Sequence, residues 1–136
     1  MAELKLDEAR VDRLDEVLAF VDGVLEQLDC PLKAQMQLDV AVEELFVNIA
    51  SYAYAPGTGP AALRVDVAEE GRVVAVTFVD QGVPYDPLAK PDPDITLSAE
   101  ERQPGGLGIF MVKRSMDDMA YRREGDSNVL TIRKRL

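Results

Sequence analysis

The 136-residue chain contains no histidine, no tryptophan and a single cysteine. Without histidine there is no histidine general base, no histidine phosphoacceptor and no histidine-ligated zinc site. The lone Cys30 excludes an intramolecular disulfide, which favours the cytoplasm as the compartment. Because Cys30 precedes Pro31 and has no basic neighbour that would activate its thiol, we expect it to be inert.

Long apolar runs and an excess of positive charge are also missing. No stretch approaches the roughly 20 apolar residues that a membrane span requires, and residues 1–7 lack the pattern of a secretory signal. The formal net charge is −10, and a field of that sign opposes binding to nucleic acids and to anionic membranes. It does not oppose ATP, because local backbone N–H groups and a divalent cation hold phosphates.

The length and the 47% hydrophobic content predict one soluble globular domain over residues 1–136. Apolar residues at helical spacing predict helices over about 10–28 and 32–54. The other expected elements are an edge strand at 2–7, strands at 62–68 and 73–79 joined as a hairpin, a helix at 106–116, and a closing hairpin of 119–123 and 128–135. This order predicts an α/β two-layer sandwich, with helices on one face of a mixed or antiparallel sheet.

The first candidate site lies on the second predicted helix, in Glu44-Leu45-Phe46-Val47-Asn48. Glu44 and Asn48 are four residues apart and therefore share a helix face. A glutamate is suited to act as a base toward a hydroxyl or water, and an asparagine oxygen is a ligand for Mg²⁺. The alternative is a solvated helix face with an incidental pair, and these two residues alone favour that alternative.

The second candidate site is the turn Asp80-Gln81-Gly82-Val83-Pro84, which follows an almost entirely apolar strand. A carboxylate at the end of a buried strand needs a partner, such as the exocyclic amine of adenine. Gly82 would let the backbone turn close to a flat ring. The alternative is an aspartate that caps its own turn, because Asp-x-Gly is common in turns.

The third candidate site is Gly105-Gly106-Leu107-Gly108-Ile109, which follows a long loop rich in proline, aspartate and glycine and opens a helix. Free N–H groups at a helix start, with no side chains in the way, suit a triphosphate. A flexible hinge is the alternative. The chain contains neither a Gly-x-x-x-x-Gly-Lys-Ser/Thr loop nor a Gly-x-Gly-x-x-Gly fingerprint after its first strand.

In combination, the three segments resemble the nucleotide-binding boxes of the histidine-kinase-like ATPase superfamily (GHKL, Bergerat fold). Within it, the short single-domain form and the ending Met116-Asp117-Asp118 … Asn128-Val129-Leu130-Thr131-Ile132 look like the bacterial anti-sigma-factor serine kinases. The resemblance covers about residues 5–136. It implies ATP and Mg²⁺ as cofactors.

The resemblance also implies a role for each site residue. Glu44 would be the catalytic base and Asn48 the Mg²⁺ ligand. Asp80 would accept the adenine amine, with Gly82 against the ring and Thr131 joining Asp80 through water. The remaining implied parts are Gly105, Gly106 and Gly108 along the phosphates, and an ATP lid at about 87–104.

The function implied is that of an ATP-binding anti-sigma factor and protein serine kinase. Such proteins phosphorylate a serine on a small antagonist and bind a sigma factor as a dimer, and the two partners compete. Two other functions fit the same boxes: a non-catalytic ATP-binding switch that sequesters a regulatory protein, and ATP hydrolysis without a protein acceptor. Some members carry an arginine directly before the glycines, where this chain has Pro104, with Arg102 nearest.

Overall fold

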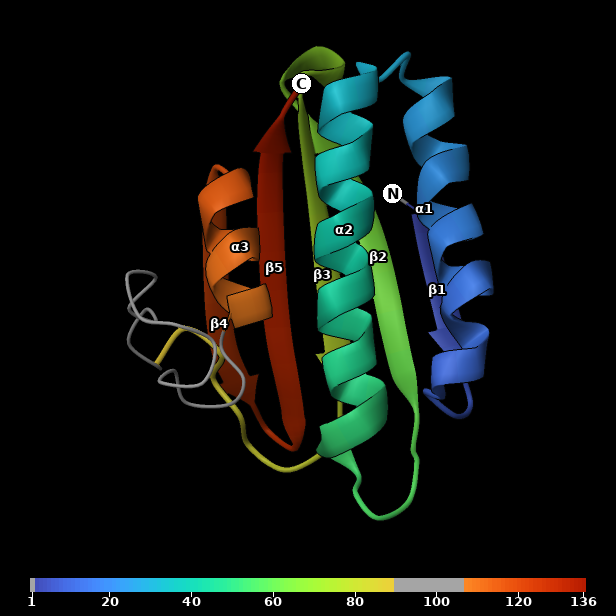
Figure 1. Ribbon diagram of the computed structural model, residues 1–136, viewed down its shortest axis with the longest axis vertical. Coiled ribbons are helices and arrows are strands. Elements are labelled where there is room, and N and C mark those ends of the chain that lie inside the picture. The colour runs from blue at the N-terminus through green and yellow to red at the C-terminus, as the bar shows by residue number, and fades with distance from the viewer. Residues whose placement is uncertain (1, 90–106) are drawn as a thin grey trace.

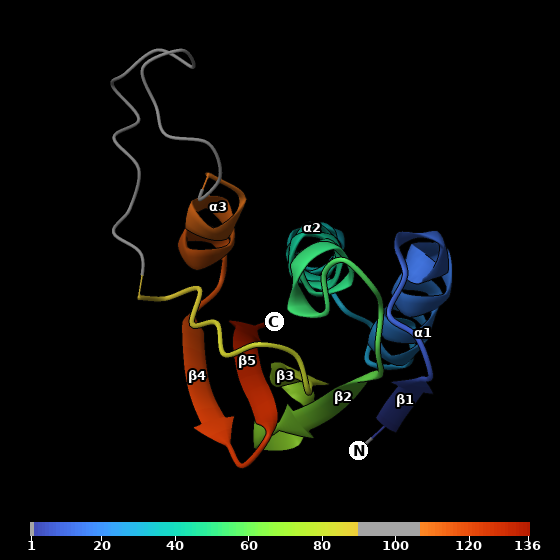
Figure 2. The same ribbon diagram turned by 90° about the horizontal axis from the view of Figure 1, so that it is seen from below.

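The computed structural model of the protein describes residues 2–89 and 107–136. These residues form two layers, a sheet of five strands and three α-helices that cover one of its faces (Figures 1 and 2). The strand order is β1-β2-β3-β5-β4, and every neighbouring pair is antiparallel. The predicted α/β two-layer sandwich is therefore confirmed, and the sheet is antiparallel, not mixed.

Alternation of buried and half-buried residues along the strands orients the sheet. In β3 (Val73–Asp80), the even-numbered residues are buried and the odd-numbered ones half-buried, so one set points to the helices and the other away from them. The other strands are β1 (Ala2–Leu6), β2 (Ala61–Ala68), β4 (Asp118–Glu124) and β5 (Ser127–Arg135). Both predicted hairpins form, β2 with β3 and β4 with β5.

The helices bury their apolar stripes against the helix-facing side of the sheet. They are α1 (Leu14–Gln27), α2 (Leu32–Asn48) and α3 (Leu107–Ser115). The predicted second helix continues past α2 as a π-helical turn, Ile49–Ala53. Phe46 of α2 and Phe78 of β3 are the largest fully buried side chains, so the centre of the core lies between that helix and that strand. None of the helices in the described residues has the length and apolar content of a membrane span.

The chain after α2 is tied to the chain after β3, and this connection shapes one end of the sandwich. The Tyr54 hydroxyl donates to the carbonyl of Pro60 and accepts from the backbone N–H of Gln81 at 2.7 Å. The backbone N–H of Val83 donates to the carbonyl of Ala53 at 3.0 Å. The Asp-x-Gly turn is thereby held against the π-helical turn that extends α2.

Candidate functional site

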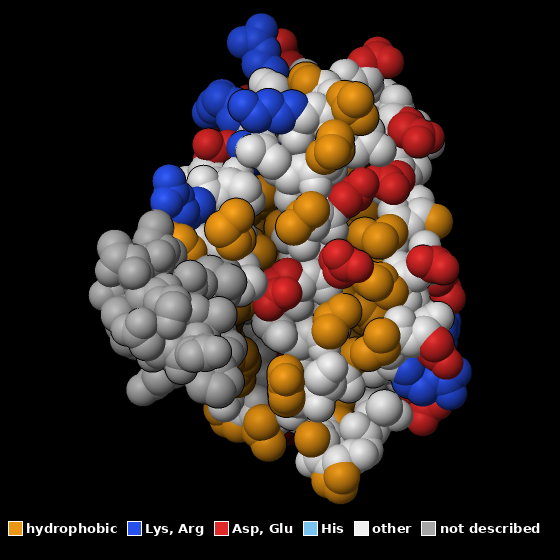
Figure 3. Space-filling view, in the orientation of Figure 1, with side chains coloured by type: hydrophobic (Ala, Val, Ile, Leu, Met, Phe, Trp, Pro, Cys, Tyr) orange, Lys and Arg blue, Asp and Glu red, His pale blue; other side chains and the backbone are white. Residues whose placement is uncertain are grey.

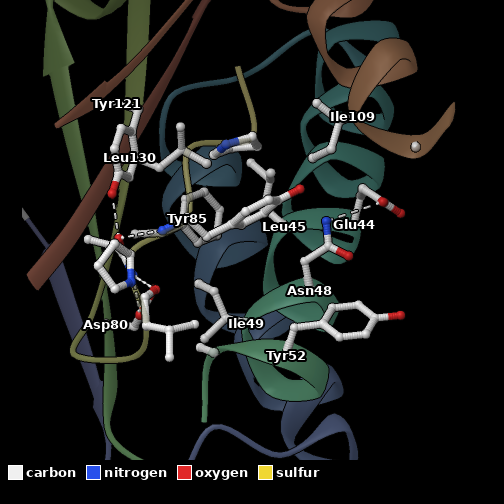
Figure 4. A pocket seen from close by; sticks show the side chains of 17 residues that line it. Glu44, Leu45, Asn48, Ile49, Tyr52, Asp80, Tyr85, Ile109, Tyr121 and Leu130 are labelled. Atoms are coloured by element: carbon white, nitrogen blue, oxygen red, sulfur yellow. Dashed lines mark hydrogen bonds between the residues drawn. The ribbon is translucent and has the colours of Figure 1, made fainter. Parts of the chain in front are cut away.

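A cavity of about 620 Å³ opens where α2 ends, between that helix, the start of α3 and the ends of β3 and β5 (Figure 4). Its walls are mostly apolar, and its carboxyl and amide side chains are Glu44, Asn48, Asp80 and Asn128. This volume and this mixture of apolar walls with a few convergent polar groups are typical of a small-molecule site. Two of the three segments singled out from the sequence therefore meet at one cavity, and the described part of the third adjoins it.

Glu44 and Asn48 stand on the helix side of the cavity, as their spacing predicts (Figure 4). Both are half-buried, and the Asn48 amide donates to Glu44 Oε1 at 3.4 Å. In this contact the amide nitrogen of Asn48 faces Glu44. The amide oxygen of Asn48 is left for another partner, and an amide oxygen is a suitable ligand for Mg²⁺. Directly after Asn48 the helix widens into the π-helical turn, a feature frequent at functional sites.

Gly108, in the first turn of α3, lies against the carboxylate of Glu44. A Cβ atom built at position 108 would overlap Oε1 and the carboxyl carbon of Glu44, so only glycine allows this approach. The backbone at the start of α3 therefore forms part of the wall next to Glu44. Of the predicted phosphate loop, Gly105 and Gly106 lie outside the described residues, as do residues 90–104 of the predicted lid.

Asp80 stands on the sheet side of the cavity and is only 6% exposed. Its Oδ1 accepts hydrogen bonds from the Gly82 backbone N–H and from the Asn128 amide, both at 2.9 Å. The turn-capping role that was the alternative interpretation is thus present, and it uses Oδ1. Asp80 nevertheless lines the cavity, so capping the turn and facing a ligand are compatible.

Asn128 was missed by reasoning from the sequence, although it is the other buried polar residue in the described chain. It is the register partner of Asp80 across β3 and β5. A signal was available in the sequence. Asn128 begins a mostly apolar stretch, and along a strand it shares the face of the core residues Leu130 and Ile132.

Thr131 does not line the cavity, and this corrects the expectation that it lies beside Asp80 near adenine. Side chains alternate along a strand, so Thr131 points away from the face that holds Asn128 and Leu130. Its hydroxyl bonds to that of Thr77 at 3.1 Å, and Thr77 is on the half-buried, helix-distant side of β3. The residue of β5 beside Asp80 is Asn128, three positions earlier.

Gly82 is buried beside the cavity but is required there for another reason than expected. A Cβ at this position would overlap the carbonyl and side chain of Ala53. The glycine thus permits close packing of the turn on the end of the π-helical segment. The prediction that it lies against a flat ring gains no support from this packing.

A second group of titratable side chains lies away from the cavity, between α1 and α2. Burial raises the pKa of Asp39 to about 7, and a hydrogen bond and charge repulsion from Asp22 act in the same direction. Asp22 in turn accepts a hydrogen bond from Gln35 at 3.1 Å, while Oδ1 of Asp39 is buried without a partner among the described residues. Burial, and to a smaller extent the negative charge of Asp39, raise the pKa of the Cys30 thiol. A raised pKa is consistent with the inert role expected for this cysteine.

Comparison with known protein families gives a match over almost the whole chain. Residues 8–134 match the family described as the histidine kinase-like ATPase domain. The serine/threonine-protein kinase BtrW of Bordetella bronchiseptica is 31% identical over 100 residues, which are 74% of this chain and 70% of that protein. The anti-sigma F factor of Pasteuria penetrans is 28% identical over 117 residues, which are 85% of this chain and 78% of that protein.

Solved structures show the same fold at low sequence identity. The crystal structure of the RsbU and RsbW domains of Rv1364c from Mycobacterium tuberculosis matches all of this chain with a TM-score of 0.66 at 15% identity; the match spans 33% of that longer chain. The SiaB–SiaC complex from Pseudomonas aeruginosa matches 98% of this chain with a TM-score of 0.59, also at 15% identity, over 89% of that chain.

Proposed function

The chain belongs to the histidine kinase-like ATPase domain family, and from this premise we propose that it is an ATP-binding anti-sigma factor and protein serine kinase. Its substrate is a serine hydroxyl on a small antagonist protein, and phosphorylation of that serine controls release of a sigma factor. The names of the relatives, a serine/threonine-protein kinase and an anti-sigma F factor, support the proposal.

The observation that carries the proposal is the separation of roles within one cavity. Asp80 and Asn128 stand on the strands, and Glu44 stands on the helix next to the start of α3. A nucleotide whose base meets Asp80 would extend its phosphates toward Glu44 and the backbone N–H groups at the start of α3. A module that only binds ATP has no need of a carboxylate at the phosphate end.

The proposed reaction is phosphoryl transfer in which Glu44 acts as general base. The carboxylate of Glu44 takes the proton of the serine hydroxyl as the serine oxygen bonds to the γ-phosphorus and the bond to the β–γ bridging oxygen breaks. The products are phosphoserine and ADP. The Asn48 amide, which donates to Glu44 Oε1, orients the carboxylate.

The residues present also fit a Mg²⁺ ion. Asn48 is the residue that would hold it. Its amide nitrogen faces Glu44, and its amide oxygen is therefore the atom that would coordinate the metal. When bound, Mg²⁺ would neutralise charge on the phosphates. Its other ligands would be phosphate oxygens and water, in keeping with the few protein ligands that this ion takes.

The surface around Glu44 offers a place for the antagonist protein. Met36 and Val40 of α2 are each 60% exposed, and Met111 of α3 is 55% exposed. Figure 3 shows hydrophobic side chains spread over this helical face, with acidic ones among them near its middle. Since Val40 is four residues before Glu44 on the same helix, we infer that the antagonist contacts these side chains when its serine reaches Glu44.

We further infer that the protein works as a cytoplasmic homodimer. In the described chain no helix covers the other face of the sheet (Figure 2). The centre of that face carries small and apolar side chains, including Ala75, Thr77 and Val79. A second copy is the occupant we propose for it. Light scattering coupled to size-exclusion chromatography tests this, and a monomer at micromolar concentration contradicts it.

A non-catalytic ATP-binding switch remains the second candidate, because this chain has Pro104 where some relatives have an arginine before the glycines. The two candidates differ in one measurement. Purified protein is titrated with ATP by calorimetry, with and without Mg²⁺, and then incubated with labelled ATP and antagonist proteins encoded by the same genome. Binding with transfer to serine supports the kinase. Binding without transfer supports the switch, and no binding at millimolar ATP contradicts both.

A further inference from the structure

We propose that Asn128 is the positioning residue that makes the pocket select a 6-aminopurine, because it holds Asp80 in an orientation that leaves one oxygen free to accept a hydrogen bond. The inference rests on the proposed function in one respect, that the ligand is a purine nucleotide. It concerns a residue for which neither the sequence pattern nor the resemblance gave a role.

Every hydrogen-bonding position of the Asn128 amide is used. Its nitrogen donates to Asp80 Oδ1 and to the carbonyl of Val83, both at 2.9 Å. Its oxygen accepts from the backbone N–H of Tyr85 at 3.2 Å and from the hydroxyl of Tyr121 at 2.5 Å. An amide has two donor hydrogens and two acceptor lone pairs, so this side chain is saturated.

The saturation also fixes which way the amide faces. If the amide were rotated by half a turn, its NH₂ group would meet the Tyr85 N–H, and its oxygen would meet Asp80 Oδ1 and the Val83 carbonyl. The flip would therefore exchange four hydrogen bonds for at least three contacts between like groups, at a site where Asn128 is only 5% exposed. The donor side of Asn128 thus always faces Asp80.

Asp80 receives its orientation from this contact. Asn128 and the Gly82 N–H together occupy Oδ1. Within residues 2–89 and 107–136, Oδ2 accepts no hydrogen bond, and Asp80 lines the cavity (Figure 4). A carboxylate oxygen held in this way accepts a hydrogen bond from the 6-amino group of adenine. The 6-oxo group of hypoxanthine or guanine is an acceptor too, and would leave two buried acceptors face to face.

The selectivity therefore depends on the nitrogen of Asn128 and not only on Asp80. Replacement of that nitrogen by oxygen, with the shape kept, puts a second acceptor against Asp80 Oδ1. Two carboxyl groups in such contact share a proton. Asp80 can then turn or carry that proton, and either change lets the cavity donate a hydrogen bond to a 6-oxo group.

The test compares binding of ATP and of inosine triphosphate, which differ at the 6-position, by calorimetry with Mg²⁺ present. Wild-type protein is expected to prefer ATP by about 100-fold or more. Asn128→Asp is expected to lower that ratio by at least about 10-fold. Thr131→Val is the matched control, since Thr131 lies on the same strand but outside the cavity, bonded to Thr77 on the helix-distant side of the sheet, and it should keep the ratio.

Each result decides the matter. An unchanged ratio in Asn128→Asp, with both nucleotides weakened equally, means that Asn128 has a purely structural role and overturns the inference. If that variant does not fold, as judged by circular dichroism, Asn128→Thr carries the same comparison and is also expected to lower the ratio. Failure of wild-type protein to bind ATP would overturn the proposed function together with this inference. An altered ratio without serine phosphorylation would leave the inference standing and count against the kinase alone.

Discussion

The backbone of Gly108 lies so close to the carboxylate of Glu44 that no side chain fits between them. The contact joins the first turn of α3 to α2, two elements far apart in the sequence. It holds the proposed base next to the segment that would receive the phosphates. The position of Glu44 therefore depends on both helices.

Gly108→Ala is expected to abolish phosphoryl transfer, although alanine favours a helix by about 1 kcal/mol over glycine. The new methyl group would displace the Glu44 carboxylate. The matched control is Gly23→Ala in α1, where, apart from its chain neighbours and the nearby backbone of its own helix, no atom lies within 4 Å of the added Cβ. That variant should keep transfer and gain about 0.5–1 kcal/mol in unfolding free energy. Equal transfer activity in the two variants would contradict the role given to the contact.

Glu44→Gln is expected to keep ATP affinity and to lose transfer by about 10²- to 10⁴-fold, because the amide cannot take the serine proton. Labelled-phosphate transfer and calorimetry measure the two quantities. Glu43→Gln is the control, since this carboxylate is adjacent in sequence but exposed and absent from the cavity wall. Parallel loss of binding and transfer in Glu44→Gln would argue against a base at this position.

Asp80→Asn is expected to weaken ATP binding by about 1–3 kcal/mol, which is roughly 5- to 150-fold. The Gly82 N–H and the Asn128 amide keep an oxygen at the Oδ1 position, so the new NH₂ group would face the adenine amine. The same variant should bind inosine triphosphate better than wild type does. Asp66→Asn, on the helix-distant side of β2, is the control and should change neither affinity. Unchanged ATP affinity in Asp80→Asn would mean that adenine does not bind at this end of the cavity.

The Asp39 carboxyl predicts a dependence of stability on pH. The folded protein holds the Asp39 proton up to about pH 7, whereas the unfolded chain releases it near 3.8. The folded state thus binds more protons between these values, and the contribution of Asp39 to stability is lost as the pH rises through that window. Asp39→Asn should therefore stabilise the protein at pH 8 relative to wild type, by about 1 kcal/mol or less because solvent screens the group.

Thermal unfolding at pH 4 to 8 measures this effect, and the gain from Asp39→Asn should increase with pH. Gln27→Ala, at the exposed end of α1, is the control, because it removes no titratable group and its difference from wild type should not change with pH. A constant difference for Asp39→Asn would mean that the carboxyl carries no proton at neutral pH.

Val40→Asp is expected to raise the KM for the antagonist protein while ATP affinity stays as it is. Val40 is 60% exposed and does not line the cavity, so the added charge would meet only the docking protein. Val11→Asp is the control, because Val11 is 52% exposed and precedes α1. Similar kinetics for the two variants would place the antagonist elsewhere.

The sequence was sufficient for the fold because each element carries a strong local signal. The two strand-like segments of β2 and β3, with the turn between them, predicted the hairpin that forms. The apolar spacing of α1 and α2 predicted both helices, and the i and i+4 spacing placed Glu44 and Asn48 on one face at the cavity. Local periodicity cannot identify neighbours in the sheet, so the pairing of β3 with β5 had to come from the structure.

The position of Thr131 and the packing of Gly82 could not be read from the sequence for a related reason. Thr131 and Asn128 lie on the same strand, but their side chains point to opposite faces of the sheet. Which of the two faces the cavity is known only when the register of β5 with β3 is known. Gly82 was expected to let the backbone turn close to a flat ring, and its contact with Ala53 was not visible because Ala53 comes from another segment of the chain. When the role of a residue depends on a contact with a residue far away in the sequence, the neighbouring sequence does not reveal that role.

Asp80 and Asn128 face each other as a cross-strand pair at the ends of two inner strands of the sheet, whereas Glu44 depends on the first turn of a short helix. Core strands generally open at free energies close to that of global unfolding, whereas helix ends open in local fluctuations. On the proposed roles, adenine recognition would rest on two inner strands and phosphate chemistry on a helix end that opens more readily. On gentle warming, we therefore expect phosphate transfer to be lost before adenine binding.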